Sequence, residues 1–101
     1  MHLIEKNINQ IYALCRKHRV STLYLFGSIL TDKFNENSDI DLSVEFNKSD
    51  IPLIDYADNY FDLIYSLEEL LGRKVDMVCE DAVKNPVFRQ ELDTKKQRIY
   101  G

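Results

Sequence analysis

The sequence predicts an α/β protein built on a small mixed β-sheet with flanking helices. Three observations support this fold class: an amphipathic helical pattern near the start of the chain, a longer one in its middle, and three short strand-like segments among them. Helices interleaved with strands in this order pack as layers on a sheet. With 101 residues the chain can bury one hydrophobic core, so we expect a single domain over residues 1–101.

The first half of the chain alternates helix and strand. Apolar residues three and four apart predict an amphipathic helix over residues 3–18. The apolar run Leu23–Phe26 is typical of a buried strand, and it leads into a Gly-Ser turn that should open one or two helical turns from Ser28 to about Asp32. Residues 39–46 then alternate strictly, which predicts a strand with one buried face and one polar face. The polar face carries Asp39, Asp41, Ser43 and Glu45.

A long helix, a third strand and a tail make up the second half. Pro52 suits the first turn of a helix, and an apolar stripe predicts one over residues 53–71 that stops at Gly72. Residues 74–79 form the third strand candidate. Asn85 and Pro86 mark the start of a short helix through Leu92, and we expect residues 97–101 to be a packed tail.

Composition narrows the classes of function. A net charge of −4 argues against a general electrostatic grip on DNA or RNA. No segment reaches the length of a membrane span, and the N-terminus lacks the apolar run of a signal peptide, so we expect a cytoplasmic protein with no membrane partner. Cys15 and Cys79 lack metal-site spacing and should be small buried hydrophobes, and His2 and His18 should lie at the surface or at a helix edge.

Three carboxylates and one turn form the candidate site. Asp39 and Asp41 are two apart on a strand, so their side chains point to the same side, and Asp76 lies on a later strand that must be a neighbour for the three to meet. Hard carboxylate oxygens suit Mg²⁺. Gly27 and Ser28 offer backbone N–H groups and a hydroxyl that suit the phosphates of a nucleotide.

This constellation predicts phosphoryl or nucleotidyl transfer with two Mg²⁺ ions. Such reactions need in-line positioning and neutralised charge more than covalent chemistry from the protein. Asp39 and Asp41 would bind both ions, while Asp76 would complete the second ion's shell and accept the proton of the attacking hydroxyl. Asp39, Asp41 and Asp76 are therefore the predicted catalytic and metal-binding residues, and Gly27 and Ser28 the predicted nucleotide-binding pair.

The motif resembles that of a known family. Gly27-Ser28, ten residues, then Asp39-Ile40-Asp41-Leu42 looks like the signature of the polymerase-β nucleotidyltransferase superfamily, and Gly72 to Val78 is similar to its third-carboxylate segment. The resemblance is closest to the minimal nucleotidyltransferases, and it covers nearly the whole chain. It implies the polymerase-β-like fold, an Mg²⁺-dependent site and a nucleoside triphosphate donor, with ATP expected.

The resemblance also implies a partner. Similar minimal nucleotidyltransferases are commonly encoded beside a small helical HEPN protein, often an RNase toxin, and act as its antitoxin; some transfer AMP to a tyrosine of the toxin. We therefore expect a protein adenylyltransferase that modifies a HEPN partner, with a homo-oligomer also possible. Transfer to RNA or an aminoglycoside is a further alternative, for which the chain has no evident acceptor domain.

One departure from the family pattern keeps a second hypothesis open. The family usually reads Gly-Ser-x-Ala-Arg-Gly, whereas this chain has Thr31 and Asp32 where that Arg and the final Gly stand. Loss of one charge-assisted phosphate contact costs about 1.5–3 kcal/mol. The alternative is thus a catalytically weak or inactive binding module that neutralises its HEPN partner by direct contact.

Overall fold

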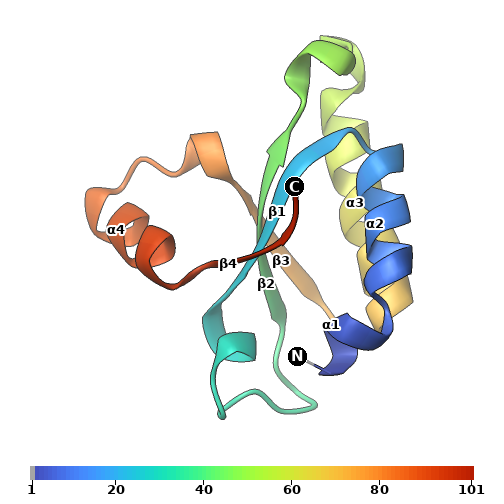
Figure 1. The fold of residues 1–101 in the computed structure, drawn as a ribbon. Helices are drawn as coiled ribbons and strands as arrows, with labels where there is room; N and C mark the ends of the chain where they lie inside the picture. The colour runs from blue at the N-terminus through green and yellow to red at the C-terminus, as the bar shows by residue number, and fades with distance from the viewer. Residues whose placement is uncertain (1) are drawn as a thin grey trace.

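The computed structural model describes residues 2–101 and consists of a four-stranded mixed sheet with helices on both faces (Figure 1). The sheet order is β3-β2-β1-β4. β1 pairs antiparallel with both β2 and β4, whereas β2 and β3 are parallel. The predicted fold class is therefore confirmed. The strands are β1 (Val20–Phe26), β2 (Ile40–Phe46), β3 (Val75–Cys79) and β4 (Gln97–Tyr100).

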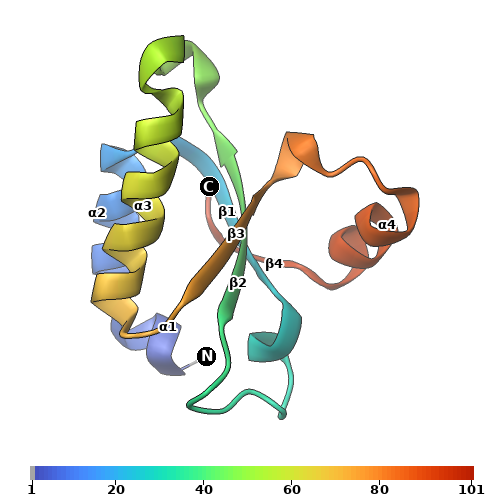
Figure 2. The same cartoon turned by 180° about the vertical axis from the view of Figure 1, so that it is seen from behind.

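The helices divide unequally between the two faces of the sheet. Helices α2 and α3 lie side by side over one face, and α4 lies on the opposite side, as both views show (Figures 1 and 2). The α-helices are α1 (His2–Lys6), α2 (Ile8–Lys17), α3 (Tyr56–Leu71) and α4 (Pro86–Lys95). Four short 3₁₀ turns lie in the connections after β1, β2 and β3: η1 (Gly27–Leu30), η2 (Lys48–Asp50), η3 (Leu53–Asp55) and η4 (Glu80–Ala82).

The hydrophobic core lies between the sheet and the α2/α3 layer. Strict alternation sends every second side chain of β2 toward those helices, as the sequence predicts. Each fully buried Leu or Ile contributes about 1.5–3 kcal/mol relative to exposure. The fully buried members include Ile11, Leu23, Leu25, Ile40, Leu42, Leu63 and Leu67.

Most predicted boundaries agree with the structure, and three elements differ in detail. The helix expected over residues 3–18 is interrupted at Asn7, whose side-chain amide donates to the Leu3 carbonyl at 2.9 Å and separates α1 from α2. The long helix starts as the 3₁₀ turn η3 before α3 begins, and it ends at Gly72 in the left-handed conformation that was expected (φ 65°). The short helix α4 runs three residues past Leu92, to Lys95.

Residues 97–101, expected to be a packed tail, contain a fourth strand that the sequence analysis did not predict. Gln97–Tyr100 forms β4 and pairs with β1 along the edge that β2 leaves open. An exposed strand edge presents unpaired N–H and C=O groups, so the last residues gain hydrogen-bond partners by adding a strand there. The sheet therefore has four strands rather than three.

His18 and the cysteines refine the predictions about single residues. His18 sits at the C-terminal edge of α2 as expected, but it is buried (2% exposed) rather than at the surface. Its Nε2 lies 2.6 Å from an Asp62 carboxylate oxygen of α3, which ties the two helices together. Cys15 is fully buried and burial raises the pKa of its thiol to about 12, whereas Cys79 is half-buried. Within residues 2–101, no helix combines the length and apolarity that a bilayer span needs.

Candidate functional site

Strand register brings two of the predicted carboxylates together. β2 and β3 are parallel neighbours, and their register pairs Asp41 directly with Asp76. Both side chains project from the sheet face opposite the hydrophobic core, because Ile40, Leu42 and Val75 occupy the alternate positions and are buried. The adjacency that the sequence predicts for these two strands is confirmed.

Asp39 lies one residue before β2 begins, at the exposed start of the strand. It is close enough to Asp41 that its charge contributes to the electrostatics of that carboxyl. Asp39 and Asp76 are exposed, whereas Asp41 is half-buried between them. The carboxylates thus form one acidic group at the solvent edge of the sheet.

Gly27 supplies the space in which the Asp41 carboxylate lies. Phe26, the last residue of β1, is paired with Asp41 across the sheet, so the turn that follows β1 runs past the Asp41 side chain. A Cβ atom at residue 27 would stand 3.0 Å from Cγ of Asp41 and closer still to its Oδ2. Gly27 also has φ +78°, which side-chain-bearing residues rarely adopt. Residue 27 therefore has to be glycine for two reasons, its positive φ and the lack of space for a Cβ atom beside the Asp41 carboxylate.

The electrostatics of the acidic group identify Asp41 as its centre. Burial raises the pKa of Asp41 above its ordinary value, and the charges of Asp76 and then Asp39 raise it further. No ion pair within residues 2–101 engages any of these three carboxylates. Their mutual repulsion is therefore not relieved by a basic side chain.

The donor set fits Mg²⁺, although the three side chains are not closed around a common point. Residues 2–101 contain no ready-made cluster of three or more metal-ligating side chains. Two features explain why the three carboxylates are spread apart. Like charges separate when no cation lies between them, and Asp39 lies outside the regular strand. Carboxylate oxygens are the ligands that Mg²⁺ prefers, and Gly27 leaves room beside Asp41 for its side chain. Asp39, Asp41 and Asp76 are the residues that would hold the metal.

The predicted phosphate turn is a short 3₁₀ helix, η1. The Ser28 carbonyl of this turn accepts two hydrogen bonds from Thr31, one from its backbone N–H at 2.9 Å and one from its hydroxyl at 2.8 Å. Thr31 and Asp32 are exposed, so the two residues that depart from the family motif face solvent. Thr31 therefore closes the turn, a structural role that sequence reasoning did not assign to it.

A buried polar cluster next to the carboxylates was missed by sequence reasoning. Ser43 was placed on the polar face of β2, yet it is fully buried, and its hydroxyl donates to the Glu80 carboxylate. Glu80 in turn accepts from Arg89 at 2.9 Å and from Lys96 at 2.8 Å. The cluster attaches α4 to the sheet face that carries Asp41 and Asp76. One sequence signal could have revealed this cluster. If the alternation of β3 is extended past its end, Asp76, Val78 and Glu80 fall on the same face of the sheet.

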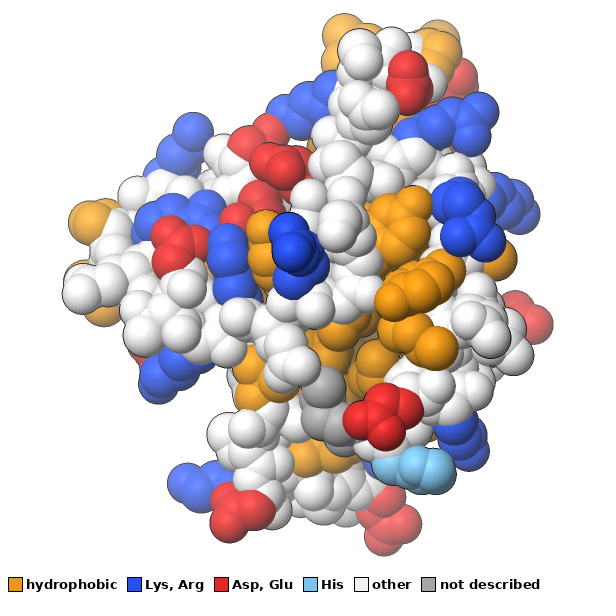
Figure 3. Space-filling view, viewed as in Figure 1, with side chains coloured by type: hydrophobic (Ala, Val, Ile, Leu, Met, Phe, Trp, Pro, Cys, Tyr) orange, Lys and Arg blue, Asp and Glu red, His pale blue; other side chains and the backbone are white. Residues whose placement is uncertain are grey.

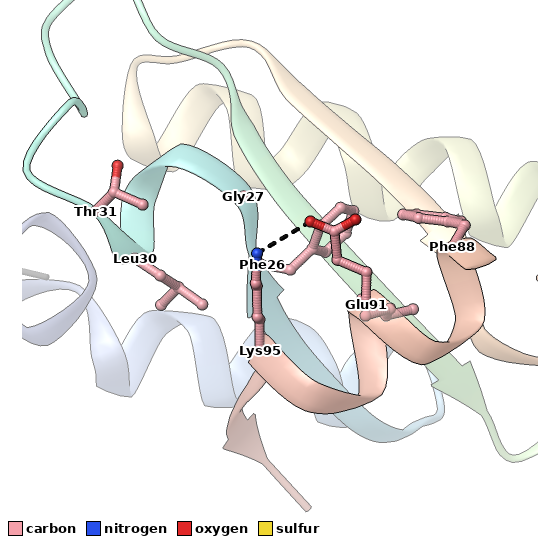
Figure 4. Close-up of a pocket in the computed structure, with 8 residues that line it drawn as sticks. Phe26, Gly27, Leu30, Thr31, Phe88, Glu91 and Lys95 are labelled. Atoms are coloured by element: carbon pink, nitrogen blue, oxygen red, sulfur yellow. Dashed lines mark hydrogen bonds and ion pairs between the residues drawn. The ribbon is translucent and has the colours of Figure 1, made fainter.

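A cleft of about 580 Å³ opens between α4 and the Gly27 turn. Phe26, Gly27, Leu30 and Thr31 line one wall, and Phe88, Glu91, Leu92 and Lys95 of α4 line the other (Figure 4). The space-filling view shows hydrophobic side chains in the hollow between α4 and the segment after β1 (Figure 3). Since Phe26 is also the sheet partner of Asp41, the cleft adjoins the acidic group.

Comparisons with known proteins identify the family and agree with the fold. The family model described as polymerase beta, nucleotidyltransferase matches residues 9–101. A protein of Methanocaldococcus jannaschii, named "Putative protein adenylyltransferase MJ1379", is 32% identical over 96 residues, which cover 87% of this chain and 93% of the relative.

Two solved structures share the fold over most of this chain. A crystal structure of a toxin–antitoxin with AMP-PNP is 28% identical, with a TM-score of 0.71, and the match covers 94% of this chain and 73% of that one. A tri-AMPylated Shewanella oneidensis HEPN toxin in complex with its MNT antitoxin gives 25% identity and a TM-score of 0.65, covering 96% of this chain and 71% of the matched chain.

Proposed function

Because the chain belongs to the polymerase-β nucleotidyltransferase family, we propose that it transfers AMP from ATP to a hydroxyl group of a partner protein. The observation that carries the proposal is the pairing of Asp41 with Asp76 beside Gly27. The resemblance to a toxin–antitoxin structure with AMP-PNP supports an ATP donor. The resemblance to an MNT antitoxin bound to its AMPylated HEPN toxin supports a HEPN-type acceptor and an antitoxin role.

Each proposed residue has a distinct task in the transfer. Gly27 and Ser28 bind the outer phosphates, and Asp39 and Asp41 would hold the metal that positions the α-phosphate. Asp76 accepts the proton of the acceptor hydroxyl while its oxygen attacks the α-phosphorus; the bond to the β-phosphate oxygen breaks and pyrophosphate leaves. When bound by Asp39, Asp41 and Asp76, Mg²⁺ neutralises phosphate charge that the carboxylates alone would repel.

The test is incorporation of label from ATP that carries ³²P in its α-phosphate. Incubation of the wild-type protein with Mg²⁺ and a HEPN-type partner protein should yield a labelled partner. Asp76→Asn should reduce labelling by at least about a hundredfold, because general-base catalysis alone contributes factors of that size. Glu45→Gln, which removes a carboxylate from an exposed position farther along β2, is the matched control and should label normally. Equal labelling by Asp76→Asn would contradict the proposal.

A second function is favoured by one observation, the Thr31-Asp32 pair in place of the family's Arg-Gly. In this alternative the protein neutralises its partner by stoichiometric contact without turnover. An Asp39→Ala/Asp41→Ala double variant distinguishes the two. If it still protects cells from the partner as well as wild type does, contact suffices; if protection is lost while the complex still forms, transfer is required.

A further inference from the structure

We propose that α4 is the second wall of the donor-nucleotide site, with Lys95 binding the phosphates and Phe88 stacking on the base. This inference rests on the proposed function and assigns two residues to it that lie outside the carboxylate and glycine motifs. It begins with the cleft, because the wall opposite α4 contains Gly27, the residue against which the Asp41 carboxylate lies. A nucleotide bound at Gly27 therefore has α4 as its neighbour.

Lys95 is the cation of α4 that remains available for a ligand. Arg89 and Lys96 are both engaged by Glu80 and Asp93, and Lys96 also lies over the Tyr24 ring, 4.2 Å from its centroid. Lys95 pairs instead with Glu91, its neighbour one helical turn away, in an ion pair whose two side chains are 66% and 60% exposed. Exposed pairs of this kind are weak. A phosphate at the Gly27 turn can therefore replace Glu91 as the partner of Lys95.

Phe88 offers an aromatic face at the other end of the same cleft. It is 37% exposed and contacts Phe26 edge to face, with ring centroids 6.0 Å apart. Phe26 is the sheet partner of Asp41, so the two rings lie beside a carboxylate that would hold the metal. Nucleobases stack on exposed aromatic rings with little dependence on base identity. Figure 4 shows the order along α4: Phe88 at one end, the Glu91–Lys95 pair toward the other.

The charge pattern of the cleft agrees with a nucleotide whose base lies at Phe88 and whose phosphates lie at Lys95. Its interior is mainly apolar, from Phe26, Leu30 and Leu92, and its charged groups are confined to Glu91 and Lys95. A base needs an apolar, aromatic surface, and a triphosphate needs a cation whose existing ion pair is weak enough to be displaced, as the exposed Lys95–Glu91 pair is. The two ends of the cleft thus match the two ends of a nucleoside triphosphate.

Calorimetric titration with ATP and with inorganic tripolyphosphate, both in excess Mg²⁺, separates the two roles. Phe88→Ala should weaken ATP binding about tenfold and leave tripolyphosphate binding unchanged, because only ATP carries a base. Phe88→Leu, which keeps a bulky apolar side chain against Phe26, should give the same pattern if the first variant folds poorly. Val87→Ala is the control, since Val87 is 74% exposed next to Phe88 and lies outside the cleft.

Lys95→Met should weaken both ligands about tenfold, because both carry the phosphates. Lys17→Met, which removes the same charge from α2, is its control for net charge. The inference is wrong if Phe88→Ala weakens both ligands equally or neither. It is also wrong if Lys95→Met matches Lys17→Met, or if Phe88→Ala lowers protein labelling without changing ATP affinity, which would make the cleft an acceptor site. If wild type binds neither ligand, the proposed function fails as well.

Discussion

At the scale of single residues, Gly27 and Asp41 show how one position constrains another. Gly27 is needed for its positive φ and because its missing Cβ leaves room for the Asp41 carboxylate. The sequence motif predicts a turn at Gly27, but it does not reveal the second reason. That reason depends on the antiparallel pairing of β1 with β2, which joins residues 26 and 41 across the sheet.

Gly27→Ala should therefore lower the free energy of unfolding by more than the strained backbone conformation alone would. A strained φ costs about 1–3 kcal/mol of unfolding free energy, and displacement of Asp41 adds to it. Gly72→Ala is the matched control, because Gly72 also has a positive φ (+65°) but nothing lies within 4 Å of an added Cβ. Urea unfolding of both variants measures the difference. Equal losses of stability would show that the Asp41 contact is unimportant.

Asp41→Asn should raise the stability of the metal-free protein while abolishing labelling. Burial, then Asp76 and Asp39, raise the pKa of Asp41 in the folded state, so the folded protein holds this proton more tightly than the unfolded chain does. Ionised Asp41 therefore destabilises the fold at neutral pH, and the penalty disappears as the pH falls through its raised pKa. Melting temperatures in EDTA at pH 7 and pH 4 measure this.

The gain from Asp41→Asn should be present at pH 7 and shrink at pH 4. Asp55→Asn, an exposed carboxylate outside the acidic group, serves as the control for net charge. A variant that melts below wild type at pH 7 would show that Asp41 is a stabilising residue instead.

At the scale of elements, α4 depends on contacts that a local pattern does not reveal. The alternation of β2 correctly separates a buried face from a polar one, yet Ser43 of the polar face is buried and donates to Glu80 of η4, which Arg89 of α4 also contacts. Likewise, Gln97–Tyr100 is too short for a period-2 pattern to stand out, and it becomes a strand only because β1 offers a free edge. Both are non-local effects, whereas periodicity alone predicts most of α2 and α3, although not the break at Asn7 or the 3₁₀ start of the long helix.

Glu80→Gln should loosen α4. Burial opposes ionisation of Glu80, but hydrogen bonds from Lys96, Ser43 and Arg89 outweigh it and hold its pKa below the ordinary value. The stabilisation is present at neutral pH and is lost as the pH falls through this lowered pKa, below about 4.5. We expect a loss of about 2 kcal/mol of unfolding free energy at pH 7, measured by urea unfolding, and a difference from wild type that shrinks as the pH is lowered below 4.5.

Glu91→Gln is the control for Glu80→Gln. It removes a carboxylate from the same region, but from the exposed pair with Lys95, and should change stability by no more than about 0.5 kcal/mol. Similar losses in the two variants at pH 7 would mean that the buried cluster does not hold α4 to the sheet.

At the scale of the whole molecule, the β-sheet brings together residues whose sequence motifs are individually common, and so forms the candidate site. A pair of aspartates two apart is common, and so is a Gly-Ser turn. The mixed sheet places β2 between β1 and β3, so that Gly27 and Asp76 meet Asp41 from its two sides. The sequence could predict that these segments are neighbours; it could not predict that α4 would fold across the same face.

The central claim is that these carboxylates bind a metal–nucleotide complex, and it can be tested without any acceptor protein. The measurement is the change in melting temperature on adding Mg²⁺ and ATP together. At about a hundred times the dissociation constant, binding adds about 2.7 kcal/mol, a rise of roughly 10 °C for a domain of this size. Wild type and Glu45→Gln should show this rise and Asp41→Asn should not. An equal rise in Asp41→Asn, or none in wild type, would contradict the account.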